Sequence, residues 1–567
     1  MKEDLIKFLN TQIPNLDVEK LLEKPKFEGH GDWSLPMFLL AKELKKAPPM
    51  IAKEFEEKLS KKLPKEISKI VAVGPFLNFY LNSQLEARQI FESFENSSIL
   101  SYKTPKKEKI VLEYPSPNTN KALHLGHVRN LLLGNSLSKI FKSAGNKIIK
   151  ANLNNDRGIS VCQAMVAYEE FGEGKTPKSE KIKADKFIAN YYVLFGKKKK
   201  EMPELETKAQ EMLLKWESGD KKVIALWEKM LSWVYEGYKQ TYIDYKYKSD
   251  KDYFESQIYK EGKEIVLNAL KNKAKGFGKE KDGAIFCDLS DVKLDKKYLL
   301  RKDGTTLYMT QDIYLATQKE KDFNADKYIY LTANEQDYHF KVLFEILERL
   351  GFANKEKLYH LSYGYVTLPE GKMKSREGNV VEADELLSEV ISDAFENLKK
   401  KSPELDKKEA KRRAEIIGYG ALAFFILKYN PTSDFVFNPK ESLSFEGETG
   451  PYVQYTYARI KSVLRKANWK RNCDIDYSVF GEKEIALIKI LKEFPEVLEE
   501  ATLKYKISLI ANYLIKICQG FNEFYQNCPI NTSEEKVKKA RLLLAENVSL
   551  IIAKGLELLD IEVLEEM

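Results

Sequence analysis

Few cysteines and few histidines restrict the metal and disulfide chemistry open to this chain of 567 residues. Its five cysteines are odd in number and form no C-x-x-C pair, which argues against a disulfide framework and against a thiolate zinc site. No grouping of Asp, Glu and His predicts a dedicated metal cage, so we expect no metal ligands in the chain. A reducing, cytoplasmic location fits this cysteine usage best.

Long apolar runs are also missing from the sequence. No stretch approaches the roughly 18 apolar residues of a membrane span, and the first residues, MKEDLIKFLNTQIPNLD, lack the apolar core of a secretory signal. We therefore expect no membrane partner. The 93 Lys and Arg residues outnumber the 85 Asp and Glu residues, and the formal net charge of +8 is compatible with a nucleic-acid partner without proving one.

What the sequence does contain is enough apolar residues, 43%, for several domain cores. Residues 1–103 begin with a helical pattern, continue into the β-rich KIVAVGPFLNFYLN and end in the polar SYKTPKKEK, which predicts an α+β domain and a linker. The segments IVLEY, HVRNLLLGNSLSKIFKSAG and KIIKANLN then follow as strand, helix and strand. This order predicts a parallel sheet covered by helices.

Strand patterns return at YIYLTA and YHLSYGYVTL, after a charge-rich helical stretch at about 169–251 that we interpret as an insertion. After about residue 386 nearly every pattern is helical. The expected fold class is therefore α/β. It comprises an α+β N-terminal domain (1–103), a Rossmann-like parallel-sheet domain with a helical insertion (104–390), a connecting helical region (391–448) and an all-α C-terminal bundle (449–567).

The tetrapeptide H-x-G-H at the predicted helix start uses two of the five histidines, His124 and His127. Neither G-x-G-x-x-G nor the P-loop pattern occurs in the chain, so another device must hold any phosphates. Imidazoles at a helix N-terminus can donate hydrogen bonds to phosphate oxygens, and Gly126 leaves room for a purine ring against the backbone. The pattern predicts a nucleotide site, with helix capping or surface exposure of both histidines as the alternative.

The surrounding residues VLEYPSPNTNKALHLGH resemble the signature of class I aminoacyl-tRNA synthetases in its arginyl form. GKMKSREGNVV, at 371–381, is similar to the second class I signature, K-M-S-K-S. Further segments extend the resemblance over essentially the whole chain: GHGDWSLPMFLLAK, RKDGTTLYMTQDI, ANEQDYHF, SFEGETGPYVQYTYARI and GLELLDIEVLEEM. The first of these resembles the extra domain that this family places against the tRNA elbow, and the fourth resembles the entry to its anticodon-binding domain.

This resemblance implies an arginine–tRNA ligase, which activates L-arginine with ATP and transfers it from the adenylate to the 3′-terminal ribose of tRNA(Arg). It implies that activation needs bound tRNA. We expect Mg²⁺ to enter with ATP, because no Asp/Glu/His cluster predicts a dedicated metal cage, and we expect a monomer. Two rivals remain open. A small-molecule adenylyltransferase also uses H-x-G-H but would be far shorter, and a silent RNA-binding paralogue would lack the phosphate-binding residues.

The same resemblance assigns site residues. The ATP-binding set is His124, Gly126, His127, Lys372 and Met373, and catalytic roles fall to the two histidines, Lys372 and Lys121. The arginine-binding set is Glu113, Asn118, Glu255, Tyr308, Asp312 and Gln336.

Within the arginine set, Glu255, Tyr308 and Asp312 are expected at the guanidinium end. A guanidinium needs carboxylates that accept paired hydrogen bonds, and the spacing of Tyr308 and Asp312 is one helical turn. Asn118, Gln336 and Glu113 are expected to hold the backbone end of the amino acid or to shape the pocket. Without the resemblance, the acids would be interpreted as surface residues and Tyr308 as a core aromatic.

The C-terminal bundle carries the expected tRNA-binding residues Tyr452, Tyr455 and Arg459, which are of types that stack on unpaired bases and bind backbone. Packing inside the bundle is the alternative for the tyrosines.

The second signature departs from its family pattern, since Ser375 stands where the second lysine is usual. Serine cannot neutralise charge that develops on a triphosphate. We expect Lys121, three residues before His124, to supply that cation. Lys374 and Arg376 are the competing substitutes.

Overall fold

The computed structural model describes residues 2–14, 16–27, 29–352, 355–367, 381–471 and 474–567. Its contacts divide the chain into two compact units. Unit 1 comprises residues 1–100, 460–495 and 516–551, and unit 2 comprises residues 101–459, 496–515 and 552–567. Lys372, Met373 and Ser375 lie outside the described residues.

Unit 2 is organised around a sheet of five parallel strands, in the order β11-β10-β4-β5-β6. From β4 the chain adds β5 and β6 on one side, and it then returns to add β10 and β11 on the other. A crevice at the carboxyl ends of β4 and β10 follows from this reversal of direction. The strand bounds are β4 (Lys109–Glu113), β5 (Lys147–Asn154), β6 (Lys251–Phe254), β10 (Lys327–Ala333) and β11 (Leu358–Tyr363).

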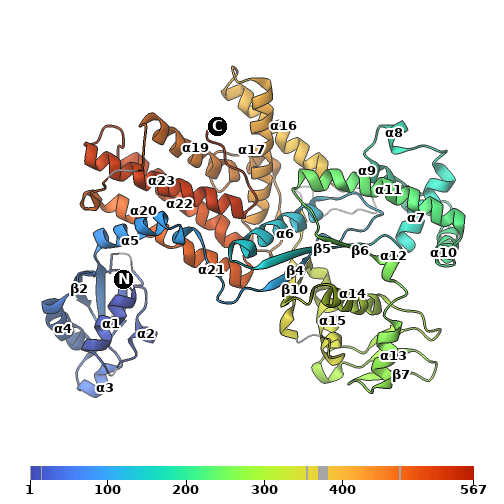
Figure 1. The fold of residues 1–567 in the computed structure, drawn as a ribbon, viewed down its shortest axis with the longest axis horizontal. Helices are drawn as coiled ribbons and strands as arrows, with labels where there is room; N and C mark the ends of the chain where they lie inside the picture. Colours follow the sequence, from blue (N-terminus) through green and yellow to red (C-terminus); the bar gives the residue numbers. More distant parts are fainter. Residues whose placement is uncertain (1, 15, 28, 353–354, 368–380, 472–473) are drawn as a thin grey trace. The chain divides into compact units, whose positions relative to one another are not determined.

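Helices cover both faces of this sheet (Figure 1). The helix α6 (Leu125–Ser143) follows β4, and 14 of its 19 residues are buried, among them the polar Arg129, Asn130 and Asn135. The opposite face packs against α14 (Tyr308–Phe323) and α15 (Asp337–Arg349) through residues such as Val111, Met309 and Leu343. The predicted α/β class and parallel sheet are confirmed.

Five helices lie between β5 and β6, where the sequence predicts a helical insertion. They are α7 (Ile159–Phe171), α8 (Pro177–Glu180), α9 (Ala184–Lys198), α10 (Glu204–Glu217) and α11 (Lys221–Asp244). After β6 come α12 (Glu255–Ile258), α13 (Lys263–Lys271) and a small antiparallel sheet that the sequence did not predict. Its strands are β7 (Phe277–Lys279), β8 (Ile285–Cys287) and β9 (Lys297–Leu300), each too short to show a clear alternation.

The rest of unit 2 is mainly helical, as predicted. It includes α16 (Ala383–Lys401), α17 (Lys407–Leu427), α18 (Pro439–Ser442), α19 (Gly450–Lys466), α21 (Phe494–Lys504) and the parallel pair β12 (Val366–Thr367) and β13 (Phe435–Val436). The helices α19, α22 (Ser508–Asn527) and α23 (Glu535–Leu558) contribute residues to both units.

Unit 1 contains an antiparallel sheet in the order β1-β3-β2, which confirms the α+β expectation for the amino-terminal region. Its strands are β1 (Trp33–Pro36), β2 (Ile67–Val73) and β3 (Phe76–Leu81), and its helices include α1 (Lys2–Gln12), α2 (Val18–Leu21), α3 (Leu40–Leu44), α4 (Pro48–Leu59), α5 (Ser83–Glu95) and α20 (Glu482–Lys492). Among the described residues of both units, no helix is long and apolar enough to cross a membrane.

Candidate active site

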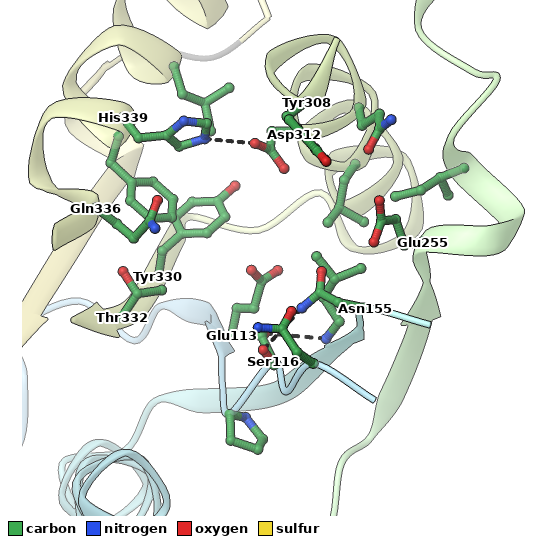
Figure 2. Close-up of a pocket in the computed structure, with 18 of the residues that line it drawn as sticks. Glu113, Ser116, Asn155, Glu255, Tyr308, Asp312, Tyr330, Thr332, Gln336 and His339 are labelled. Carbon is green, nitrogen blue, oxygen red and sulfur yellow. Dashed lines mark hydrogen bonds and ion pairs between the residues drawn. The ribbon is translucent and has the colours of Figure 1, made fainter. Parts of the chain in front are cut away.

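A cavity of about 610 Å³ opens at the carboxyl ends of β4 and β10, the place that the strand order predicts. Figure 2 shows Tyr308, Asp312 and His339 on one side, and Glu113 and Ser116 on the other. All six residues of the expected arginine-binding set line this cavity: Glu113, Asn118, Glu255, Tyr308, Asp312 and Gln336.

One wall of the cavity contains a buried ion pair between Glu113 and Lys319. The Lys319 ammonium also lies 4.4 Å from the centre of the Tyr330 ring. The Lys319 ammonium pairs with Oε2 of Glu113, and this ion pair fixes the carboxylate in the cavity wall. Sequence reasoning missed Lys319, although its spacing of seven residues from Asp312 places both on one face of α14.

Asp312 faces the cavity from the first turns of α14, and its Oδ2 lies 2.7 Å from Nε2 of His339 on α15. A carboxylate has two oxygens, so Asp312 can accept further hydrogen bonds while this contact persists. Tyr308, one turn earlier, is 70% exposed and therefore accessible to a ligand.

Glu255 begins α12 at the end of β6, and the neighbouring Asp156 fixes that turn. The Asp156 carboxylate accepts hydrogen bonds from the Ser256 amide and hydroxyl, both at 2.7 Å. Burial raises the pKa of Glu255 to about 7, the charges of Asp156 and Asp312 act in the same direction, and Arg157 opposes them. The sequence did not single out Asp156 or Arg157, and only the pairing of β5 with β6 brings them beside Glu255.

His124 and His127 both cap α6. The Gly126 amide donates to His124 Nδ1 (3.1 Å), and the His124 amide donates to His127 Nδ1 (3.2 Å). A ring nitrogen that accepts carries no proton, so each neutral imidazole has its proton on Nε2 and keeps that N–H as a donor. Both histidines therefore cap the helix, as the alternative predicts. The capping contacts use only Nδ1, so Nε2–H of each imidazole can still donate to a phosphate.

The charge state of both imidazoles is set by burial. Burial lowers the pKa of His124 to about 4 and holds that of His127 well below its usual value, with the positive charge of Lys121 adding to both shifts. The rings lie 4.1 Å apart, and His127 lines the cavity. A side-chain carbon at Gly126 would stand 3.0 Å from the His124 ring, so the capping geometry itself favours glycine there.

The residues that follow the second signature lie against the H-x-G-H segment. The Leu125 amide donates to the Val381 carbonyl (3.2 Å), and the Ala383 amide donates to the Leu123 carbonyl (2.9 Å). The end of the second signature and the residues that follow it therefore lie beside the start of α6.

The residues expected to bind tRNA lie on α19. Tyr455 is 43% exposed, and its ring is 6.2 Å from that of Phe445. The neighbouring Tyr457 is buried, as the packing alternative predicts. Tyr452 and Arg459 are partly exposed, so a role of these residues at a nucleic-acid surface stays a prediction.

Comparison with known proteins places this architecture in one family. Residues 89–439 match the family described as tRNA synthetases class I (R), catalytic domain. The arginine–tRNA ligase of Treponema denticola is 43% identical over 567 aligned residues, which cover 96% of this chain and 94% of the relative. The chain belongs to the arginyl-tRNA synthetase family.

Other comparisons agree with membership of the arginyl-tRNA synthetases. Residues 1–81 match the arginyl tRNA synthetase N terminal domain, and residues 453–567 match the DALR anticodon binding domain. The arginine–tRNA ligase of Parabacteroides distasonis is also 43% identical, covering 96% of this chain and 95% of the relative. Arginyl-tRNA synthetase of Thermus thermophilus has a similar structure, with a TM-score of 0.82, 26% identity and full coverage of both chains.

Proposed function

We propose that the cavity binds L-arginine beside an ATP site at the start of α6, and that the chain joins arginine to tRNA(Arg). The observation that carries this proposal is the convergence of Asp312, Glu255 and Tyr308 in one cavity that His127 also lines. Two carboxyl groups and an aromatic ring suit a planar cation, and a helix N-terminus suits phosphates.

The reaction has two steps. The arginine carboxylate attacks the α-phosphorus of ATP and releases pyrophosphate, and a ribose hydroxyl at the tRNA 3′ end then attacks the adenylate carbonyl and releases AMP. The class resemblance assigns this attack to the 2′-hydroxyl. Rate enhancement comes from positioning and charge stabilisation, with Nε2–H of His124 and His127 and the Lys121 ammonium as the donors.

The remaining assignments extend this proposal. Mg²⁺ enters with ATP, since no group of three or more His, Cys, Asp or Glu side chains in the described part of the chain is placed to hold a metal. Lys372 and Met373 complete the ATP site from the second signature. We also propose that the protein is a cytoplasmic monomer. Residues 104–390, which include the helical insertion at about 169–251, carry out catalysis, and residues 391–448 form a helical connection. Residues 1–103 and 449–567 contact the tRNA.

The direct test is ATP-dependent attachment of each labelled amino acid to total tRNA. Attachment of arginine alone supports the proposal, because a ligand without a guanidinium leaves partly buried carboxyl groups unpaired. Citrulline is the sharpest competitor, since it has the shape of arginine and no charge at that end. Charging of citrulline as efficiently as arginine would contradict the carboxylate pocket.

Asp312→Asn is expected to raise the KM for arginine by about tenfold or more while the KM for ATP changes little. The substitution removes one charge that faces the guanidinium and leaves the side-chain shape unchanged. Steady-state pyrophosphate exchange measures both constants. Asp322→Asn on the same helix is the matched control, because Asp322 accepts a hydrogen bond from the Tyr253 hydroxyl (2.8 Å), and its arginine KM should match that of the unmodified chain.

The arginine KM is expected to rise about tenfold as the pH falls from 8 to 6, because protonation removes the Glu255 charge. The pKa of Glu255, raised to about 7 by burial, places this carboxyl mainly ionised at pH 8 and mainly neutral at pH 6. A bound guanidinium favours the ionised form. Glu255→Gln should raise the KM at pH 8 and remove most of its pH dependence, and an unchanged dependence in this variant would assign the titration to another group.

A further inference from the structure

We propose that the inserted helix α11 positions the first signature loop for arginine activation, and that Tyr238 is the positioning residue. This inference rests on the proposed function. Residues 114–124 connect β4 to α6 and include Asn118 of the expected arginine site and Lys121 of the expected phosphate site. A loop that must hold both side chains needs its backbone fixed by other elements.

The first half of this loop is fixed by the end of β5. The Thr119 amide and hydroxyl donate to the Asn155 carbonyl at 3.1 and 3.0 Å, and the Asn155 amide donates to the Pro117 carbonyl at 3.1 Å. The Ser116 amide donates to the side chain of Asn152 at 3.2 Å. These contacts anchor residues 116–119 to the sheet.

The second half of the loop is held by α11. The Tyr238 hydroxyl lies 2.6 Å from the carbonyl oxygen of Lys121 and 2.9 Å from that of Asn118. Tyr238 is 2% exposed, and burial holds its pKa well above the usual value, so it stays a neutral donor. The Lys121 amide also donates to the Asn118 carbonyl at 3.2 Å, which closes the turn that Tyr238 covers.

The same face of α11 holds the segment that follows the second signature. Thr241 and Tyr245 lie three and seven residues after Tyr238, so all three side chains share one side of the helix. The Tyr245 hydroxyl donates to the Ala383 carbonyl (2.7 Å), and the Thr241 hydroxyl donates to the Asp384 carboxylate (3.2 Å). One face of this helix therefore contacts both the first signature loop and the residues that follow the second signature.

Packing alone does not account for this arrangement. Tyr238 and Tyr245 are fully buried phenols, and phenylalanine would fill the same volume without a polar atom. Their hydroxyls instead hydrogen-bond the Lys121 and Ala383 carbonyls, and phenylalanine would give up these hydrogen bonds. These hydrogen bonds therefore fix the backbone of Lys121 and Asn118, from which their side chains extend.

The test is Tyr238→Phe, which removes one oxygen atom. We expect kcat for pyrophosphate exchange, measured with arginine, ATP and tRNA(Arg), to fall about tenfold, and the arginine KM to rise severalfold. Tyr168→Phe is the matched control, because the Tyr168 hydroxyl of α7 donates to the Lys175 carbonyl (2.8 Å) in the same insertion. The control should lose a similar amount of thermal stability and retain wild-type kcat.

A double variant separates positioning from general stability. If Tyr238 acts on kcat through Lys121, Lys121→Ala with Tyr238→Phe should have a kcat within about twofold of Lys121→Ala alone. Independent, multiplying losses in kcat would overturn the proposal, as would wild-type kcat in Tyr238→Phe. Absence of arginine-dependent exchange in the unmodified chain would instead contradict the proposed function.

Discussion

Replacing His124 or His127 with alanine is expected to lower pyrophosphate exchange by about 100-fold or more, because each substitution removes a hydrogen-bond donor to the reacting phosphates. Exchange is measured with saturating arginine, ATP and tRNA(Arg). Both imidazoles stay neutral above about pH 6, since burial lowers the pKa of His124 to about 4 and that of His127 well below its usual value. The loss should therefore be equal at pH 6.5 and pH 8.

Each alanine substitution also removes one capping contact, so a matched pair of substitutions is needed. Asparagine places an acceptor near the position of Nδ1, which retains the cap, and lacks any atom at Nε2. Glutamine places its amide near Nε2 and loses the acceptor near Nδ1. At either position, Asn should preserve thermal stability and lose activity, and Gln should do the reverse. Retained activity in the Asn variants would mean that these histidines only cap α6.

Lys121→Ala is expected to depress tRNA-dependent pyrophosphate exchange by about 100-fold while the arginine KM changes little. Lys121 lies three residues before His124 in the loop that leads to α6, and its positive charge lowers the pKa of both His124 and His127. That position suits a cation that neutralises charge on the triphosphate. Lys121→Arg retains the charge and should keep most of the activity.

Two further measurements test whether Lys121, and not Lys374 or Arg376, supplies this cation. Adding Ser375→Lys to Lys121→Ala should restore part of the exchange rate, because it returns the usual lysine to the second signature. Nuclear magnetic resonance titration of Lys121→Ala should show the His124 pKa rising, since a nearby positive charge is lost. Near-normal exchange in Lys121→Ala together with a collapse in Arg376→Ala would transfer the role to the downstream segment.

Local sequence patterns predict the main elements of the catalytic unit. The IVLEY run forms β4, shifted by one residue, and KIIKANLN forms β5 with the predicted bounds. These predictions succeed because a buried parallel strand and an amphipathic helix each have a period that is visible in a short window. The small sheet β7-β8-β9 escaped prediction because strands of three or four residues show no such period.

The site residues also divide into those that the sequence predicts and those that it does not. H-x-G-H and the six expected arginine-binding residues could be named from the sequence, because they stand in segments that resemble those of the arginyl-tRNA synthetases. The partners of these residues could not. Lys319 beside Glu113, Asp156 beside Glu255 and Tyr238 above Lys121 come from segments about 100 or more residues away in the chain.

The sequence by itself therefore determined which chemistry the chain carries, since residue types and their local spacing decide what can bind a phosphate or a guanidinium. Only the tertiary structure decided the state of those groups. Burial of His124 and His127 sets their charge, the capping contacts leave the proton on Nε2, and burial raises the Glu255 pKa. Such effects depend on distance and solvent exclusion, which arise when remote segments pack together.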